Sequence, residues 1–259
     1  MSAETHRRGW LKAMGASLGA LWLAACDRLN ENERVKAGLG KAETLSLRAQ
    51  RALQNRTALA REFAEADISP DFRANGSISP ADPEYRALLA GNFADWRLVV
   101  DGLVERPLSL SLANLRALPA RTQITRHDCV EGWSSIGKWT GARLGPLLDR
   151  AGLKPEARYI VLYCADTLEE TLDGTGRYYE SIDLIDAYHP QTILAYAMNG
   201  AALAVAHGAP LRLRVERQLG YKHAKFVARI EAVASLAGIG RGKGGYWEDV
   251  GAYQWYGGI

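Results

Sequence analysis

The irregular succession of short apolar segments and long polar stretches limits most strongly what this chain can fold into. Apolar runs predict five strands, at residues 96–104, 159–164, 193–198, 211–215 and 226–234. Short helices are predicted at 112–118, 144–151 and 182–187, and the polar, glycine-containing segment 166–179 is predicted to be a loop. Ser111 is a predicted N-cap of the first helix, and Gly152 is a predicted stop after the second. Because these elements do not form repeating βαβ units, the sequence predicts an α+β fold with mixed β-sheets and short helices.

The first 26 residues have the pattern of an export signal. Arg7 and Arg8 precede an apolar run, 13–25, that is too short to span a bilayer as a stable helix. This order is typical of a twin-arginine signal, which predicts a periplasmic location. Because the twin-arginine route exports folded proteins, often with a cofactor already inserted, the signal also favours a bound cofactor.

Cys26 predicts a possible lipid anchor. The sequence Leu23-Ala24-Ala25-Cys26 resembles a bacterial lipobox, in which the cysteine becomes the lipidated N-terminus. Acyl chains would hold the protein at a membrane, since each buried CH₂ contributes about 0.8 kcal/mol. Asp27 resembles a signal for retention at the inner membrane. The alternative is ordinary signal cleavage beside an incidental cysteine.

Residues 27–67 predict a helical N-terminal arm. The segment is polar and rich in Arg, Ala, Glu and Leu, and its leucines are spaced for one or two amphipathic helices. Thr44 is a plausible N-cap of the second helix. The arm is therefore expected to pack on the domain that follows or to space it from the membrane.

The charge and the cysteines argue against a nucleic-acid-binding protein, a disulfide-rich protein and a structural zinc site. A formal net charge of +3, without runs of like charge, does not favour a nucleic-acid partner. The three cysteines, Cys26, Cys129 and Cys164, are far apart and do not describe a disulfide framework. Neither a CxxC pair nor a Cys/His pair at zinc spacing occurs, so a structural zinc site is not expected.

Cys129 is the most unusual of these cysteines because its neighbours are polar. It lies in the stretch 125–134 beside His127, Asp128 and Glu131. Four roles are open: a nucleophile with a histidine base, a redox thiol paired with Cys164, a ligand to a soft metal, and an inert buried cysteine.

A second polar cluster lies between residues 207 and 225. Arg212 and Arg214 project from the same face of a predicted strand. The segment 220–225, Gly-Tyr-Lys-His-Ala-Lys, offers backbone N–H groups and two ammonium groups on a tight turn, which suits a phosphate. No Walker loop or GxGxxG accompanies it, so ATP and dinucleotides are poorly supported.

These motifs together resemble the catalytic domain of the sulfite oxidase family, in its bacterial exported, haem-free branch. The resemblance rests on His127 to Ser134, His207 to Arg212 and Gly220 to Lys225, and it covers about residues 68–259. It implies a sulfite oxidase-type molybdopterin-binding fold and a molybdenum cofactor with one pterin. In this family the metal moves between Mo(VI) and Mo(IV) while an oxygen atom passes to or from the substrate.

The resemblance also implies roles for individual residues. Cys129 is the implied metal ligand, and Glu131 and Arg73 are implied near the reacting centre, Arg73 facing an anionic substrate. Cys164 stands where relatives have a threonine, and His207 stands where they have an asparagine. The implied cofactor-binding set is Asn75, His127, Cys129, Cys164, His207, Arg212, His223, Ala224 and Lys225.

The expected function is therefore oxygen-atom transfer at a periplasmic molybdenum centre, with a small sulfur oxo compound such as sulfite as substrate. Two alternatives stay open: a reductase of methionine sulfoxide or other S- or N-oxides, and a non-enzymatic lipoprotein that keeps the fold. No CxxCH haem motif occurs, so electrons are expected to pass to or from an external haem protein. The dimerisation domain of full-length sulfite oxidases has no counterpart after residue 259, which favours a monomer.

Overall fold

The computed structural model describes residues 32–53, 55–169 and 176–259. The predicted export signal and Cys26 lie outside the described residues. The chain divides into two compact units, Met1–Leu53 and Gln54–Ile259. Among the described helices, none has the length and apolar content needed to cross a membrane.

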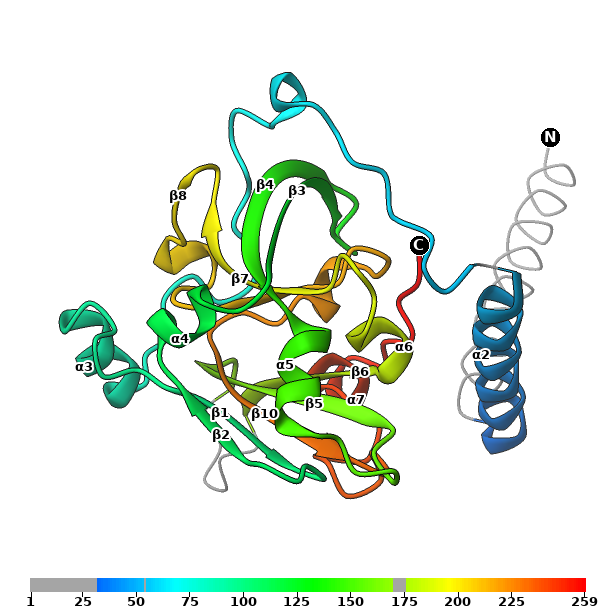
Figure 1. Cartoon of the computed structure of the whole chain (residues 1–259). Coiled ribbons are helices and arrows are strands. Elements are labelled where there is room, and N and C mark those ends of the chain that lie inside the picture. The colour runs from blue at the N-terminus through cyan, green and yellow to red at the C-terminus, as the bar shows by residue number, and fades with distance from the viewer. Residues whose placement is uncertain (1–31, 54, 170–175) are drawn as a thin grey trace, which may run out of the picture. The chain divides into compact units, whose positions relative to one another are not determined.

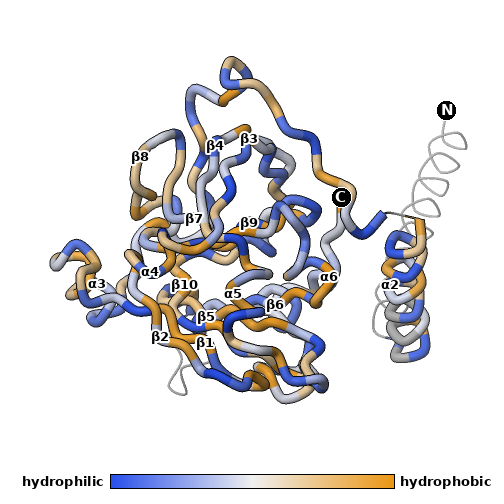
Figure 2. Tube along the Cα trace, in the orientation of Figure 1, coloured by the Kyte–Doolittle hydropathy of each residue, from blue (hydrophilic) through white to orange (hydrophobic). Residues whose placement is uncertain are grey.

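In the first unit, the described residues 32–53 form one continuous helix, α2 (Glu33–Leu53). Asn32 marks its start, where the side-chain oxygen accepts the N–H of Arg34 (2.9 Å). Thr44 lies inside this helix, so its predicted role as an N-cap is wrong: the segment holds no proline, and its Ala, Leu, Lys and Arg residues favour propagation. Hydrophobic and hydrophilic residues intermix along α2 (Figure 2), and Leu45 and Leu53 are exposed.

The second unit contains two five-stranded sheets. In the first, the strand order is β2 (Leu108–Leu110), β1 (Leu98–Gly102), β10 (Val227–Val233), β5 (Tyr159–Thr167) and β6 (Arg177–Asp183). β1 and β10 run parallel, and the other neighbours run antiparallel. The sheet is therefore mixed, as the sequence predicts.

The second sheet has the order β3 (Ala120–Asp128), β4 (Ser134–Arg143), β7 (Ile193–Met198) and β8 (Ala201–Ala202), with β9 (Arg212–Arg214) also paired to β7. Its pairings are all antiparallel. In the view of Figure 1 this sheet lies above the first one, and α5 lies between them.

The helices of this unit are short: α3 (Pro83–Ala90), α4 (Leu112–Arg116), α5 (Leu144–Ala151), α6 (Leu184–Ala187) and α7 (Tyr246–Val250), with 3₁₀ turns at Glu65–Asp67, Val205–His207 and Gly220–Lys222. Two predicted end signals are confirmed. The Ser111 hydroxyl accepts the N–H of Asn114 (3.2 Å) at the start of α4, and Gly152 ends α5 with a φ of 71°.

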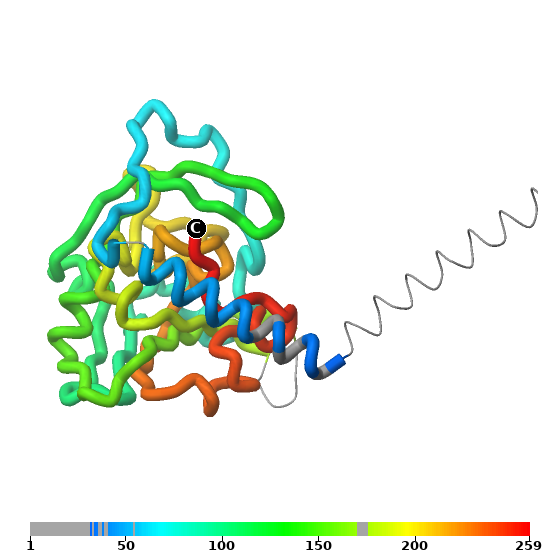
Figure 3. The backbone as a smooth tube through the Cα atoms, turned by 90° about the vertical axis from the view of Figure 1, so that its right-hand side faces the viewer, coloured from blue at the N-terminus to red at the C-terminus, as the bar shows by residue number. Residues whose placement is uncertain are grey.

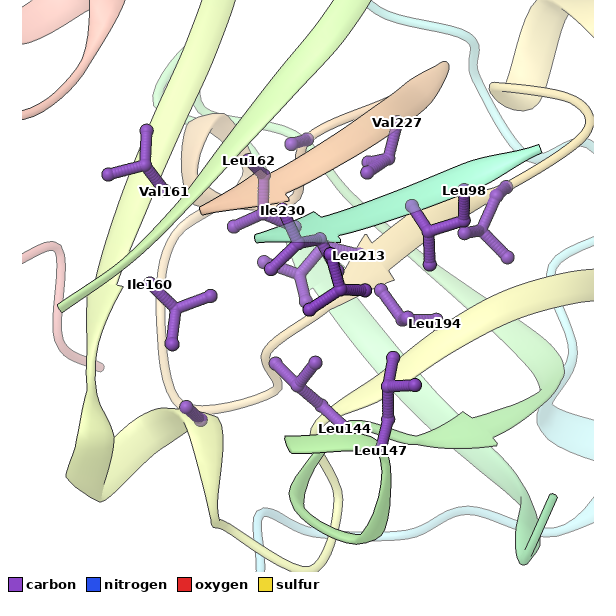
Figure 4. Close-up of a cluster of buried hydrophobic side chains, with 14 of the residues drawn as sticks. Leu98, Leu144, Leu147, Ile160, Val161, Leu162, Leu194, Leu213, Val227 and Ile230 are labelled. Atoms are coloured by element: carbon purple, nitrogen blue, oxygen red, sulfur yellow. The ribbon is translucent and has the colours of Figure 1, made fainter. Parts of the chain in front are cut away.

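The main core lies where the two sheets and α5 meet. Figure 4 shows Leu162 and Ile230 of the first sheet facing Leu213 of the second, with Leu144 and Leu147 of α5 beside them. All five side chains are fully buried. Each such side chain contributes about 1.5–3 kcal/mol on burial, so this cluster is the main reason why the two sheets and α5 stay packed together.

The sequence misplaces two boundaries between residues 166 and 187. The predicted loop 166–179 is partly strand, because β5 continues to Thr167 and pairs there with Arg177 of β6. The predicted helix 182–187 begins only at Leu184. The residue before it, Asp183, belongs to β6 and caps α6 by accepting the N–H of Asp186 (2.9 Å). Pairing between strands therefore overrides the local polarity of these segments.

A segment before the first helix of the unit joins the β3–β4 hairpin. Phe63 donates its N–H to the carbonyl of Ile124 (2.9 Å), and Ser69 donates to Ile136 (3.0 Å). Figure 3 shows this segment, in cyan, beside the hairpin, in green. The chain continues from these bonds to Asn75 at the candidate site. Residues 55–67, which the sequence analysis assigned to the arm, belong to the second unit.

Candidate cofactor and active site

Cys129 lies in the tight turn that joins β3 to β4. Its N–H donates to the carbonyl of Trp133 (2.9 Å), and its own carbonyl accepts the N–H of Gly132 (3.0 Å). Gly132 has a φ of 85°, a left-handed conformation that glycine adopts at little cost. The hairpin therefore holds the thiol in one place, with only 9% of the residue exposed.

The charges around the Cys129 thiol act in opposite directions. Burial raises the pKa of the thiol above its ordinary value. The backbone N–H of Glu131 lowers this pKa, and the carboxylate of Glu131 raises it. The guanidinium of Arg73 also lowers it. Cys129 and Cys164 are both free thiols, so the redox pair that the sequence left open is not formed.

A cavity of about 110 Å³ opens beside Cys129. Four other residues that the sequence singled out line it: Asn75, Glu131, His223 and Lys225. The rest of the wall is Gly76, Ser77, Val130, Asp166, Leu168, Tyr178, Gly220, Tyr221, Trp247 and Tyr253.

Lys225 stands on one wall of this cavity. Its ammonium donates to the backbone carbonyls of Asn75 (2.6 Å), Ala206 (3.2 Å) and Ser77. Burial, together with the nearby positive charge of Arg212, lowers the pKa of Lys225 to about 7. A bound anion would reverse this shift.

His223 precedes Lys225 by two residues and is 3% exposed. Its Nε2 lies 3.0 Å from the carbonyl of Gln218, and its buried Nδ1 has no hydrogen-bond partner within the described part of the chain. Burial and the charge of Arg214 lower the pKa of His223 well below the ordinary range. Ala224, between the two, is buried and pairs its carbonyl with the N–H of Leu213 (2.8 Å).

Behind the cavity wall, two arginines lie over one tryptophan. The guanidinium carbons of Arg212 and Arg214 are 4.9 and 4.5 Å from the ring centroid of Trp139, so the two side chains share one face, as their spacing predicts. Arg214 is bound by Glu216, but Arg212 bonds the carbonyls of His207 (3.0 Å) and His223 (3.4 Å). Burial and Arg214 lower the pKa of Arg212 to about 9.

His127 connects this arginine layer to the turn at Gly220. Arg214 donates to Nδ1 of His127 (3.0 Å), which leaves the proton on Nε2. That Nε2 is buried and has no partner among the residues that the structure describes. A Cβ built on Gly220 would come within 2.6 Å of it, so only glycine lets the turn approach so closely.

Besides His127, Arg212 and Ala224, three further expected site residues do not line this cavity. Arg73 is exposed and lies over the Trp133 ring at 5.5 Å, and Trp133 in turn donates to Glu131 (3.0 Å). His207 packs against Phe72, with ring centroids 5.7 Å apart. Cys164 is buried and lines a neighbouring cavity.

One sequence expectation at the phosphate turn is wrong. Of the two ammonium groups between residues 220 and 225, that of Lys222 is fully buried and bound by Glu180 and by Glu248 (2.9 Å). Spacing alone could not reveal these partners, which lie 42 and 26 residues away in the sequence. Only Lys225 of this pair faces the cavity.

The residues present fit a molybdopterin cofactor. Arg212 and Lys225 are neighbouring cations whose pKa values are lowered by burial and by nearby positive charge, and His223 beside them adds a buried imidazole that its lowered pKa keeps neutral. This group of side chains suits a phosphate. The cavity also presents the Cys129 thiol, and thiolates bind soft metals. Gly220 lines the same cavity and lets this turn approach His127 closely.

Several cavity residues were not foreseen from the sequence. They are Asp166, Tyr178, Tyr221, Trp247 and Tyr253. Asp166 lies in a segment predicted to be a loop, and the aromatic residues lie in stretches without a hydrophobic period. The order of strands β5 and β6 and the position of α7 bring them together, which no local pattern shows.

Gly220→Ala is expected to lower the free energy of unfolding by about 1–3 kcal/mol, the usual cost of overpacking. The added methyl group would meet the ring of His127, which is buried and held by Arg214. Gly238→Ala is the control, since a Cβ there meets no described atom within 4 Å. Denaturant unfolding of both variants measures the difference, and equal midpoints would contradict the close approach.

A fold of one mixed and one antiparallel sheet, with a thiol and a phosphate-binding cluster around one cavity, defines a pterin-binding oxidoreductase. Residues 87–237 match the family described as the oxidoreductase molybdopterin binding domain. The chain belongs to this family. It is a molybdenum-dependent oxidoreductase with a sulfite oxidase-type fold, as the sequence predicts.

Three curated proteins are similar to this chain. The putative protein-methionine-sulfoxide reductase subunit YedZ1 of Azospira oryzae is 36% identical over 97% of this chain and 87% of its own length. The protein-methionine-sulfoxide reductase catalytic subunit MsrP of Campylobacter jejuni is 34% identical over 66% of this chain. The MsrP of Xanthomonas campestris is 36% identical over 54%. The matches span 60% and 46% of the two MsrP proteins.

Among solved structures, the chain is similar to the sulfane dehydrogenase SoxCD from Paracoccus pantotrophus. The TM-score is 0.48 and the identity is 26%, over 54% of this chain and 39% of that one.

Proposed function

We propose that this protein reduces an S-oxide, of the methionine sulfoxide class, to the thioether. The balanced reaction consumes two protons and two electrons and releases the oxygen atom as water. The proposal departs from the sulfite-oxidising reading that the sequence favoured. It is supported by the three relatives, two of which are named as catalytic subunits and one as a putative subunit of a protein-methionine-sulfoxide reductase.

The observation that carries the proposal is the charge of the wall beside Cys129. Glu131 lines the cavity there, whereas the Arg73 guanidinium lies outside it over Trp133. A sulfite dianion would meet a carboxylate at this point, and like charges at short range repel. A sulfoxide is neutral, and its apolar substituents match the neighbouring side chains of Val130 and Leu168.

In this proposed reaction the protein uses one molybdopterin cofactor, whose metal would be bound by the Cys129 thiolate. When bound, this group supplies a two-electron centre that can exchange an oxygen atom with the substrate. The chain's own residues hold and orient it: Arg212, His223 and Lys225 through its phosphate, and Asn75 and the Gly220 turn through their backbone and side-chain polar groups. His127, His207 and Ala224 support these residues from behind, whereas Cys164 lines the neighbouring cavity.

The proposal includes the cellular setting that the sequence predicts. The protein is exported by the twin-arginine route to the periplasm, is held at the inner membrane if Cys26 is lipidated, and works as a monomer. Electrons reach it from a separate haem protein. Fractionation of cells that express the chain with Arg7→Lys and Arg8→Lys checks the route, because the variant should stay unexported.

The test is a two-way activity screen of purified, exported protein. With a reduced viologen dye as donor, we expect oxidation of the dye on addition of methionine sulfoxide, free or within a peptide. With an artificial electron acceptor, we expect sulfite to give at most a small fraction of that rate. Sulfite oxidation without sulfoxide reduction would overturn the proposal, and molybdenum content measured on the same samples shows that the protein is loaded.

A further inference from the structure

Helix α2 has an exposed apolar face to which the site and the proposed reaction give no role. The apolar and polar residues that intermix along this helix (Figure 2) separate around its axis, because residues three, four and seven apart share one face. The apolar face consists of Val35, Ala42, Leu45, Ala49 and Leu53. Val35 is half-buried and the others are exposed, Leu45 by 69% and Leu53 by 87%.

A row of cations runs along one edge of the apolar face. This basic row consists of Arg34, Lys41 and Arg48, which are seven residues apart, and each of them directly precedes a residue of the apolar face. All three are exposed, and none forms an ion pair within the described ranges. The helix contains five basic residues and only two acidic ones, Glu33 and Glu43, so its surplus of three positive charges equals the formal net charge of the entire chain.

The composition of α2 suits the surface of a bilayer and not its interior. Its 21 residues have the length to span the hydrocarbon core, but seven of them are charged, and charges at the centre of a bilayer are costly. An amphipathic helix with cations beside its apolar face lies in the plane of the interface instead. Its apolar residues then enter the boundary of the acyl chains, and its cations stay at the lipid headgroups.

A second copy of the helix fits the apolar face less well than a lipid surface does. The seven-residue spacing would place Ala42 and Ala49 at the seam of a coiled coil, with the basic row beside it. The positions on the opposite edge, 39, 46 and 53, are Leu, Ser and Leu, so a parallel second copy would offer the basic row no carboxylate there. Anionic headgroups, in contrast, pair with every cation of the row.

We propose that α2 is an interfacial helix, whose apolar face enters the surface of an anionic bilayer while the basic row binds the lipid phosphates. Cys26 precedes the first residue of the helix by seven positions, so a lipid chain on this cysteine would act on the same bilayer. The inference goes beyond the proposed reaction, and it depends neither on that reaction nor on the lipidation of Cys26.

Cosedimentation with vesicles tests the proposal on the mature chain without a lipid chain. Residues 27–259 are exported behind a cleavable twin-arginine signal that has no lipobox, so that no acyl group contributes to binding. We expect the protein to sediment with vesicles of mixed phosphatidylcholine and phosphatidylglycerol, and to bind far less to phosphatidylcholine alone. High salt should release it, because salt screens the attraction between the basic row and the headgroups.

Two variants test the two parts of the helix separately. Replacement of the whole basic row by glutamine should weaken binding to the mixed vesicles about 100-fold, since each cation near an anionic surface contributes about fivefold. Leu45→Glu should weaken it by at least about tenfold, because the leucine no longer enters the acyl boundary. Glutamine and glutamate are good helix formers, so α2 should persist in both variants.

The controls make the same kinds of change at exposed residues outside α2. Leu59→Glu and Arg86→Gln should bind the mixed vesicles as the wild type does. Unchanged binding in the basic-row variant or in Leu45→Glu would overturn the proposal. A wild-type chain that stays in solution with the mixed vesicles would also overturn it: dimers that Leu45→Glu dissociates would then assign the face to a second copy, and a lower unfolding midpoint of Leu45→Glu would assign it to the rest of the chain. The dye-linked assay of sulfoxide reduction is independent of these results.

Discussion

Cys129→Ser is expected to lower sulfoxide-reducing activity by more than about 100-fold. Removal of a residue that only supports a metal ligand typically costs about 10–100-fold in metal affinity or activity, and the ligand itself should cost more. A serine hydroxyl does not ionise near neutral pH and is a hard oxygen donor, so it cannot replace a thiolate on a soft metal. Dye-linked turnover measures the loss.

Pterin content should stay close to that of the wild type in this variant, because Arg212, His223 and Lys225 are unchanged. The matched control is Cys164→Ser, which changes the other buried free thiol. We expect that control to keep most of its activity, since Cys164 lines a different cavity. If Cys129→Ser kept full molybdenum content and full activity, the metal ligand would be a different group.

The sequence predicts the thiol and the basic residues of the site, but it does not predict which residues bind them. Cys129, His223 and Lys225 were recognisable because a thiol among polar residues and a basic turn are unusual in the sequence. Lys222 looked equivalent to Lys225, but its two carboxylate partners come from β6 and α7. Asp166 gave no signal, because only the fold shows that its oxygen faces a cavity.

The β3–β4 hairpin shows why strands cannot always be predicted from the alternation of hydrophobic residues. Alternation is present in β3, but the side chains that face inward are polar: Gln123, Thr125 and His127 are each 1% exposed. A search for alternating apolar residues therefore finds no strand here. The polar inner face is satisfied by residues that are distant in the sequence, as when Gln123 donates to Glu216 (2.9 Å) and His127 accepts from Arg214 (3.0 Å). The strand that leads to the functional cysteine therefore lacks the alternating apolar pattern, because the side chains that support the site are polar.

A buried ionic triad stabilises the turn behind the cavity. Lys222 is bound by Glu180 and Glu248, and the three side chains are buried to within 1% of complete exclusion from solvent. Burial lowers the pKa of Lys222, but the two carboxylates outweigh this and raise it above its ordinary value. Burial and the second carboxylate raise the pKa of Glu180 well above its ordinary range, even though Lys222 opposes them. The single ammonium of Lys222 therefore offsets the free-energy cost of burying two carboxylates.

Lys222→Met should lower the free energy of unfolding by about 3–5 kcal/mol, because it leaves two buried carboxylates without a cation. Lys138→Met is the matched control. Lys138 pairs with Glu65 at the surface, where such a pair contributes only about 0–1 kcal/mol. Denaturant unfolding at neutral pH measures both variants. A loss no greater than that of Lys138→Met would show that the triad does not stabilise the fold.

The sign of the pH dependence separates the loss of charge pairing from a simple packing defect. In Lys222→Met the folded-state pKa of Glu180 should rise further above the unfolded one. The added stability then belongs to low pH and is lost as the pH rises. The defect relative to wild type should therefore be smaller at about pH 5 than at about pH 8. Adding Glu180→Gln and Glu248→Gln to Lys222→Met should recover most of the loss, since neutral amides carry no buried charge, whereas a packing defect would persist at every pH and in the triple variant.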